Sequence, residues 1–152
     1  MRKKSKKINE TRIMYFNFLE NEFDFYYNKD MKNPLKEGLR RILERMENIS
    51  KILEAVLQPE NNYSAIHEYS FLNEKEKKEI VLIYRKFMYY QRAIIEALLK
   101  NNVEDIKKIL EKITCEWESM KNQTIIIIKK IKESWNSSSD IGSMDEYKKY
   151  FG

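Results

Sequence analysis

The sequence predicts an all-α protein, an antiparallel up-down four-helix bundle with a short C-terminal helix. Glycine and proline are scarce, with 3 Gly and 2 Pro in 152 residues, and 35% of the residues are charged. This composition suits long surface helices better than the many turns of a β-sandwich. Apolar residues recur at alternating steps of three and four, which places them along one side of an α-helix. The connection at Asn101 and Asn102 is about two residues long and the one that ends at Pro34 is almost as short, so the helices on either side of each are expected to run antiparallel,.

The clearest of these stretches predicts one long helix from Asn102, its capping residue, to about Trp135. Glu104 and Asp105 lie in its first turn, where carboxylates favour the positive end of the helix dipole. Its apolar side has eight members, of which only Thr124 is semi-polar: Ile106, Leu110, Ile113, Trp117, Met120, Thr124, Ile127 and Ile131. A continuous apolar seam is kept from water most simply by packing against similar helices.

Two other long helices are predicted before it. Asn33 caps the first, Pro34 fits its first turn, and Pro59 lies beyond its end. Asn73 and Glu76, three residues apart, form a pair like a capping box at the start of the second. The first helix has these apolar positions: Leu35, Leu39, Ile42, Met46, Ile49, Leu53 and Val56. The second has these: Ile80, Ile83, Phe87, Tyr90, Ile94 and Ala97.

Three further helices are expected from weaker patterns. One runs from about residue 8 to residue 31 and is rich in aromatic residues. Its seam has four members: Phe16, Leu19, Phe23 and Tyr26. A short helix is expected at residues 64–71, in the connection between the long helices. A short C-terminal helix is expected after Ser143 and Glu146, which have the spacing of a capping box.

The positive charge of the chain is concentrated near its N-terminus. Five basic residues supply the net charge of +5: Arg2, Lys3, Lys4, Lys6 and Lys7. The remainder has 24 basic and 24 acidic residues and is therefore neutral. We expect a basic flexible tail at residues 1–7 and a single helical-bundle domain at residues 8–152.

The sequence favours a cytoplasmic protein without a membrane span. The longest purely apolar run is Ile80 to Tyr84, whereas a spanning helix needs about 20 residues. The single cysteine, Cys115, cannot form an intramolecular disulfide bond,. No early stretch combines a basic segment, a long apolar core and a small-residue cleavage site.

No residue pattern predicts an enzyme, and no cofactor or metal is expected. A di-metal bundle site needs a Glu-x-x-His pair on each of two helices, but the only histidine is His67, in a connection. His67 beside Glu68 has the residue types of a general base and its partner, although a histidine in a connection is more often structural. Cys115 is followed by Glu116, and an acidic neighbour disfavours the reactive thiolate.

A surplus of apolar residues is the most specific indication of function. Four of them lie at positions that their own seams leave outside: Phe18, Phe25, Ile125 and Ile126. Leaving such side chains in water is unfavourable, so something is expected to cover them. Either the connection and terminal helix do so within one chain, or a second chain does. We therefore predict a non-enzymatic protein that acts through protein–protein interaction. Through these four residues it would bind a second copy of itself, as a homodimer, or another helical protein.

An alternative prediction is an accessory nucleic-acid-binding protein. Its contacts would be the five basic residues of the tail and an outer row on one helix: Lys78, Arg85, Tyr89 and Arg92. Such a row can follow phosphates while Tyr89 stacks on a base. Glu96 lies one turn beyond Arg92 and weakens the positive field.

Overall fold

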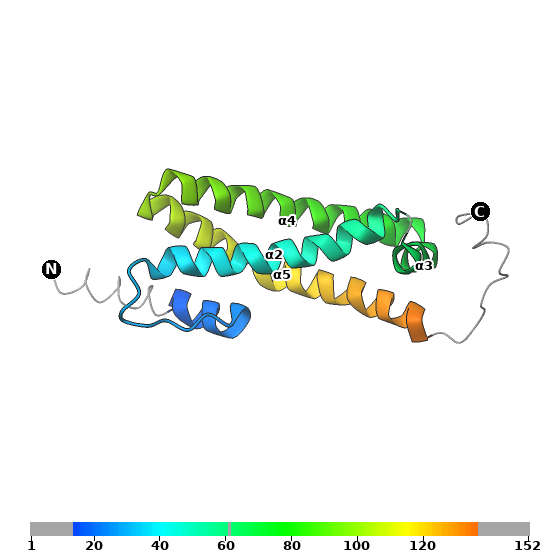
Figure 1. Cartoon of the computed structure of the whole chain (residues 1–152), viewed down its shortest axis with the longest axis horizontal. Helices are drawn as coiled ribbons and strands as arrows, with labels where there is room; N and C mark the ends of the chain where they lie inside the picture. Colours follow the sequence, from blue (N-terminus) through cyan, green and yellow to red (C-terminus); the bar gives the residue numbers. More distant parts are fainter. Residues whose placement is uncertain (1–13, 61, 137–152) are drawn as a thin grey trace. The chain divides into compact units, whose positions relative to one another are not determined.

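The computed structural model describes residues 14–60 and 62–136, and these residues form helices and connections without a β-strand (Figure 1). The helices are α2 (Pro34–Leu57), α3 (Tyr63–Phe71), α4 (Glu74–Lys100) and α5 (Val103–Asn136). A helical segment at residues 14–23 precedes them. The all-α prediction is confirmed, as are the starts and ends of the long helices to within about two residues. Residues 1–7 and the helix predicted after Ser143 lie outside the described residues.

The chain divides into two compact units. Of the described residues, unit 1 contains residues 14–48 and Phe87–Glu118, and unit 2 contains residues 49–60, 62–86 and 119–136. Helices α2, α4 and α5 each contribute residues to both units, whereas α3 belongs to unit 2. None of the helices in the described ranges combines the length and apolar content needed to cross a bilayer.

Asparagine side chains cap the N-termini of α4 and α5. The Asn73 side-chain oxygen accepts a hydrogen bond from the Glu76 backbone N–H at 2.9 Å, and the Glu76 carboxylate accepts one from the Asn73 N–H at 2.8 Å. The predicted capping box is therefore confirmed. Asn101 has a φ of 54° and ends α4, and Asn102 Oδ1 accepts from the Glu104 N–H at 2.8 Å. Two adjacent asparagines thus end one helix and begin the next.

The predicted seams form the core of the units. The eight apolar or semi-polar positions predicted on α5, from Ile106 to Ile131, form what we call the α5 seam, and all eight are buried. The six positions predicted on α4 are buried as well. On α2, Leu35 and Ile49 are half-buried and the other five predicted positions are buried. Thr124, the semi-polar member of the α5 seam, donates its hydroxyl hydrogen to the Met120 carbonyl at 2.8 Å. Each large apolar side chain in these seams gains about 1.5–3 kcal/mol from burial, so the helices are held together as a bundle by their apolar sides.

The predicted helix over residues 8–31 is wrong at its C-terminal end. Helical structure stops at residue 23, and Asp24 has a φ of 52°, in the left-handed region. The backbone N–H of Phe25 then donates to the Leu19 carbonyl at 3.2 Å, and the Arg45 guanidinium binds the Asp24 carboxylate at 2.9 Å. This turn leaves Tyr26 outside, with 65% of its surface exposed, although it was predicted as a seam residue.

The segment at residues 14–23 approaches α2 closely at Gly38. A Cβ atom at this position would lie 2.5 Å from Leu19 Cδ1, and Leu19 is completely buried. The glycine therefore provides the space that lets Leu19 pack against the backbone of α2.

Replacing this glycine by alanine is expected to lower stability. Overpacking costs about 1–3 kcal/mol, and the better helix propensity of alanine returns only about 1 kcal/mol. We predict that Gly38→Ala lowers the free energy of unfolding by about 1 kcal/mol in urea titrations followed by circular dichroism. Combined with Leu19→Ala, which removes the clashing atoms, Gly38→Ala should cost nothing further. A stabilising effect of Gly38→Ala in the wild-type background would contradict this packing.

Candidate interaction surface

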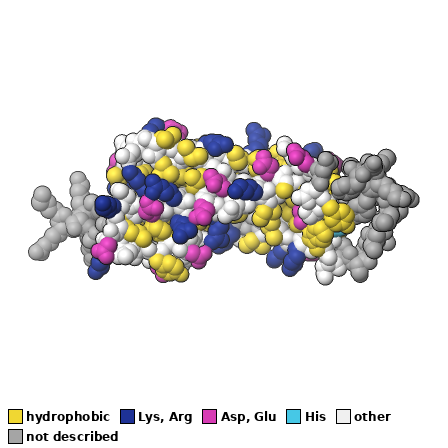
Figure 2. Space-filling view, in the orientation of Figure 1, with side chains coloured by type: hydrophobic (Ala, Val, Ile, Leu, Met, Phe, Trp, Pro, Cys, Tyr) yellow, Lys and Arg dark blue, Asp and Glu magenta, His cyan; other side chains and the backbone are white. Residues whose placement is uncertain are grey.

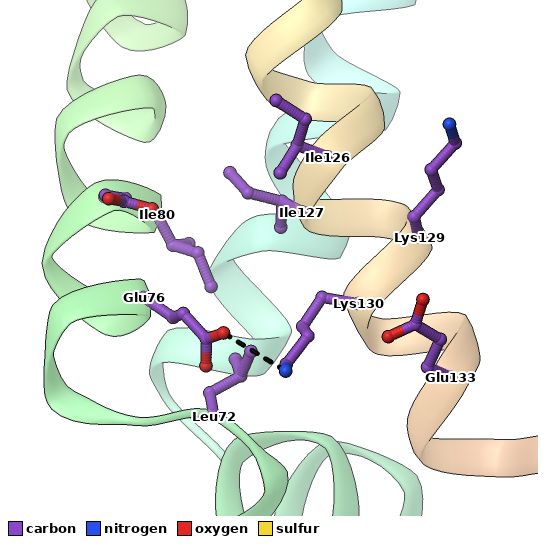
Figure 3. A pocket seen from close by; sticks show the side chains of 9 residues that line it. Leu72, Glu76, Ile80, Ile126, Ile127, Lys129, Lys130 and Glu133 are labelled. Atoms are coloured by element: carbon purple, nitrogen blue, oxygen red, sulfur yellow. Dashed lines mark ion pairs between the residues drawn. The ribbon is translucent and has the colours of Figure 1, made fainter. Parts of the chain in front are cut away.

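A groove of about 310 Å³ lies between α4 and α5 in unit 2 (Figure 3). Its apolar lining consists of Leu72, Ile80, Ile126 and Ile127. Leu72, Ile80 and Ile127 are buried, whereas 66% of Ile126 is exposed. The groove therefore has an apolar floor and one large apolar side chain at its edge.

A run of four isoleucines places apolar side chains on more of α5 than the seam can bury. Successive helical residues are turned by about 100° about the helix axis. Ile127 belongs to the α5 seam and is buried, whereas Ile125, Ile126 and Ile128 are 43%, 66% and 36% exposed. Of these, Ile126 is the exposed isoleucine that lines the groove. Two adjacent residues, Ile126 and Ile127, therefore form the exposed edge and part of the buried floor of the groove.

Charged side chains line the two edges of the groove. Glu76 and Glu79 lie on the α4 edge, and Lys129, Lys130 and Glu133 lie on the α5 edge. An ion pair of 3.3 Å between the Lys130 Nζ and Glu76 Oε1 spans one end of the groove (Figure 3).

Glu76 is held in place from two sides. Its Oε2 accepts the hydrogen bond from the Asn73 N–H at the start of α4, while its Oε1 faces Lys130. The Lys130 ammonium also lies 5.3 Å from the centre of the Phe71 ring. Because the cap and the ion pair share one carboxylate, the start of α4 is tied to α5 and the end of the groove keeps its shape.

The groove is suited to burying apolar side chains from another surface. Its charged groups lie at the edges, and Glu76 and Lys130 are paired with each other. In the part of the chain that the structure describes, no three His, Cys, Asp or Glu side chains are placed to hold a metal ion. In the same residues every buried side-chain nitrogen or oxygen has a hydrogen-bond partner.

A second cluster in unit 2 joins α3 to the end of α5. His67 Nε2 lies 2.9 Å from the Ser134 carbonyl oxygen, and its ring packs against Trp135 with 4.4 Å between ring centres. The Trp135 indole N–H donates to Glu68 at 2.8 Å. Glu68, considered from the sequence as a partner of His67, thus binds Trp135, and both residues attach α3 to α5.

Two buried tyrosines in unit 1, Tyr15 and Tyr90, have raised pKa values. Burial raises the pKa of Tyr90, and the hydrogen bond that its phenol donates to Glu116, together with the charge of that carboxylate, raises this pKa further. Burial likewise raises the pKa of Tyr15, with a smaller contribution from Glu111. Both phenols are therefore kept neutral. Cys115, by contrast, is exposed.

Three comparisons with known proteins address the family of this chain. A scan of protein-family models gives no match. Searches of curated proteins and of solved structures give none either.

The four residues predicted to bind a partner are in different environments. Phe25 is buried, with 5% of its surface exposed, which corrects the expectation that it lies outside. The turn at Asp24 is the cause, because it ends the helix before Phe25 and directs the chain back along unit 1. Phe18 is half-buried and contacts Phe23 edge to face at 5.5 Å. The exposed pair is Ile125 and Ile126 in unit 2.

The residues of the alternative nucleic-acid surface are exposed but divided between the units. Lys78 and Arg85 lie in unit 2, and Tyr89 and Arg92 lie in unit 1. Basic and acidic side chains are interspersed on the face shown in Figure 2. The basic tail lies outside the described residues. Nucleic-acid binding thus stays a prediction from the sequence.

The buried phenol of Tyr90 predicts a loss of stability in alkaline solution. Because its pKa is raised in the folded state, this group contributes stability below the ordinary tyrosine value of about 10 and loses that contribution as pH rises further. We predict that Tyr90→Phe lowers the free energy of unfolding at pH 7 by about 1 kcal/mol through loss of the hydrogen bond. The difference in free energy of unfolding between the wild-type protein and Tyr90→Phe should be smaller in urea titrations at about pH 11, because only the wild-type protein loses the contribution of the phenol there.

The matched control is Tyr89→Phe, which removes a phenol whose residue is 59% exposed. This variant should match the wild-type protein at both pH values. If Tyr89→Phe reduced the loss of stability between pH 7 and about pH 11 as much as Tyr90→Phe does, the assignment of this loss to the buried phenol of Tyr90 would be wrong.

Proposed function

We propose that this chain is a non-enzymatic helical-bundle protein that acts through protein–protein interaction and associates with itself. The single observation that carries the proposal is Ile126, a large apolar side chain 66% exposed beside an apolar groove. Its contact with water is unfavourable, and burial of such a side chain gains about 1.5–3 kcal/mol. A second copy of the chain supplies the same apolar surface, and symmetric dimers are the commonest oligomers.

The antiparallel up-down arrangement of the helices is part of this proposal. Two residues, Asn101 and Asn102, connect α4 to α5, and Leu72 and Asn73 connect α3 to α4. Connections this short favour antiparallel neighbours in a bundle. Such an arrangement leaves α4 and α5 side by side along the groove, as a helical docking surface requires.

The chemistry of the groove supports binding of an apolar surface. Its volume of about 310 Å³ is at the lower end for small-molecule sites, which also bring a few polar groups together around the ligand. Here the polar groups lie at the edges, and the ion pair between Glu76 and Lys130 closes one end. This arrangement of apolar centre and charged edge is typical of protein interfaces.

The proposal predicts that a charge at Ile126 prevents self-association. The wild-type protein should form dimers in sedimentation equilibrium between about 1 and 100 µM, and Ile126→Lys should weaken the dimer at least about tenfold. Because Ile126 is largely exposed, the variant should keep its helical circular-dichroism spectrum.

The matched control is Leu99→Lys, which places the same charge on a residue that is 81% exposed in unit 1. This variant should dimerise like the wild-type protein. A wild-type protein that stays monomeric over the whole concentration range would refute self-association.

A further inference from the structure

We propose that the groove of unit 2 binds the same groove of a second copy, with the two-fold axis parallel to α4 and α5. This inference rests on the proposed function and names its surface and geometry. The two edges of the groove differ in charge. The α4 edge carries the carboxylates of Glu76 and Glu79, whereas the α5 edge carries the ammonium groups of Lys129 and Lys130 beside Glu133.

The orientation follows from the symmetry of a dimer. In a two-fold interface, residue i of one copy contacts residue j of the other, and j contacts i. An axis parallel to the groove places the α4 edge of each copy opposite the α5 edge of its partner, so that Glu79 faces Lys129 at two equivalent contacts. An axis across the groove would instead place α4 against α4 and bring acidic edges together. Like charges in an interface are unfavourable, so the parallel axis is selected.

The apolar side chains fit the same orientation. Figure 3 shows Ile126 and Ile127 towards one end of the groove, the pair of Glu76 and Lys130 towards the other, and Ile80 between them. A rotation about an axis along the groove keeps each residue at its own level. Ile126 of each copy therefore lies over the α4 side of its partner, near Ile80, and both copies of Ile126 leave water.

Glu79 and Lys129 are the charges best placed to pair between copies. Glu76 and Lys130 already bind each other at 3.3 Å, and Glu76 also caps α4. Among the described residues, Glu79 has only a long contact of 4.0 Å with Lys75, whose side chain is 87% exposed. A surface pair of this kind contributes little, so Glu79 loses little by turning to Lys129 of a second copy.

Reversing these two charges tests the orientation. Glu79→Lys alone gives a chain with lysine at both positions, and Lys129→Glu alone gives one with glutamate at both. Each variant should self-associate about tenfold more weakly than the wild-type protein, because both symmetric contacts become repulsive. An equimolar mixture should form heterodimers with at least wild-type affinity, since both contacts then join opposite charges.

Native mass spectrometry with one variant labelled by nitrogen-15 distinguishes heterodimers from homodimers. The control is Lys132→Glu, an equal change of charge on the exposed surface of α5 outside the groove lining. This variant should dimerise like the wild-type protein. When it is mixed with Glu79→Lys, the heterodimer should be no tighter than the wild-type dimer.

The possible outcomes separate this inference from the function on which it rests. A wild-type protein that is monomeric at all concentrations refutes self-association itself. A dimer that Ile126→Lys disrupts, but that neither charge reversal weakens, leaves self-association standing and overturns the orientation. The orientation is also overturned if both single variants are weakened and their mixture forms no heterodimer. If the groove instead binds another occupant, such as an unrelated helix, the wild-type protein alone should be monomeric at all concentrations.

Discussion

The α5 seam is the constraint on which the rest of the structure depends. Its eight apolar or semi-polar side chains, from Ile106 to Ile131, are all buried. In unit 1, Trp117 packs against Phe23 with 4.5 Å between ring centres, and its indole N–H donates to Glu22 at 2.7 Å. In unit 2, Ile127 lines the floor of the groove. Burial of the seam fixes the rotation of α5 about its own axis, and this rotation turns Ile126 towards water.

The features that the sequence predicted well are those set by local chemistry. Helix periodicity identified the seams, and the asparagine caps identified the starts of α4 and α5, because both depend on residues within a few positions of one another. The exposure of Ile125 and Ile126 followed from the same periodicity. No long-range contact was needed for any of these predictions.

The features that the sequence did not predict depend on contacts between residues far apart in the chain. Asp24, just after the end of the helical segment, takes a left-handed conformation that is uncommon for residues other than glycine,, and its partner Arg45 lies on α2. The aromatic residues around it favoured a continued helix, so the burial of Phe25 was missed. The groove was missed for a similar reason, since Glu76 and Lys130 meet only when α4 and α5 pack together.

The size of the groove indicates what kind of association to expect. Stable protein–protein interfaces bury about 1,600 Å² in total, whereas this groove holds about 310 Å³ and is lined by nine residues. A contact centred on it is therefore expected to be weak and to depend on protein concentration. Charge pairing at the edges of such an interface determines orientation more than it adds affinity.

The most direct test of this account is amide hydrogen exchange measured residue by residue along α5. If burial of the seam holds the helices together, amides at Ile113 and Trp117 in unit 1 and at Thr124 and Ile127 in unit 2 should all exchange slowly. Fast exchange that begins at Ser119 and continues to the end of the helix would contradict the account, because it would show that the seam does not hold α5 in unit 2.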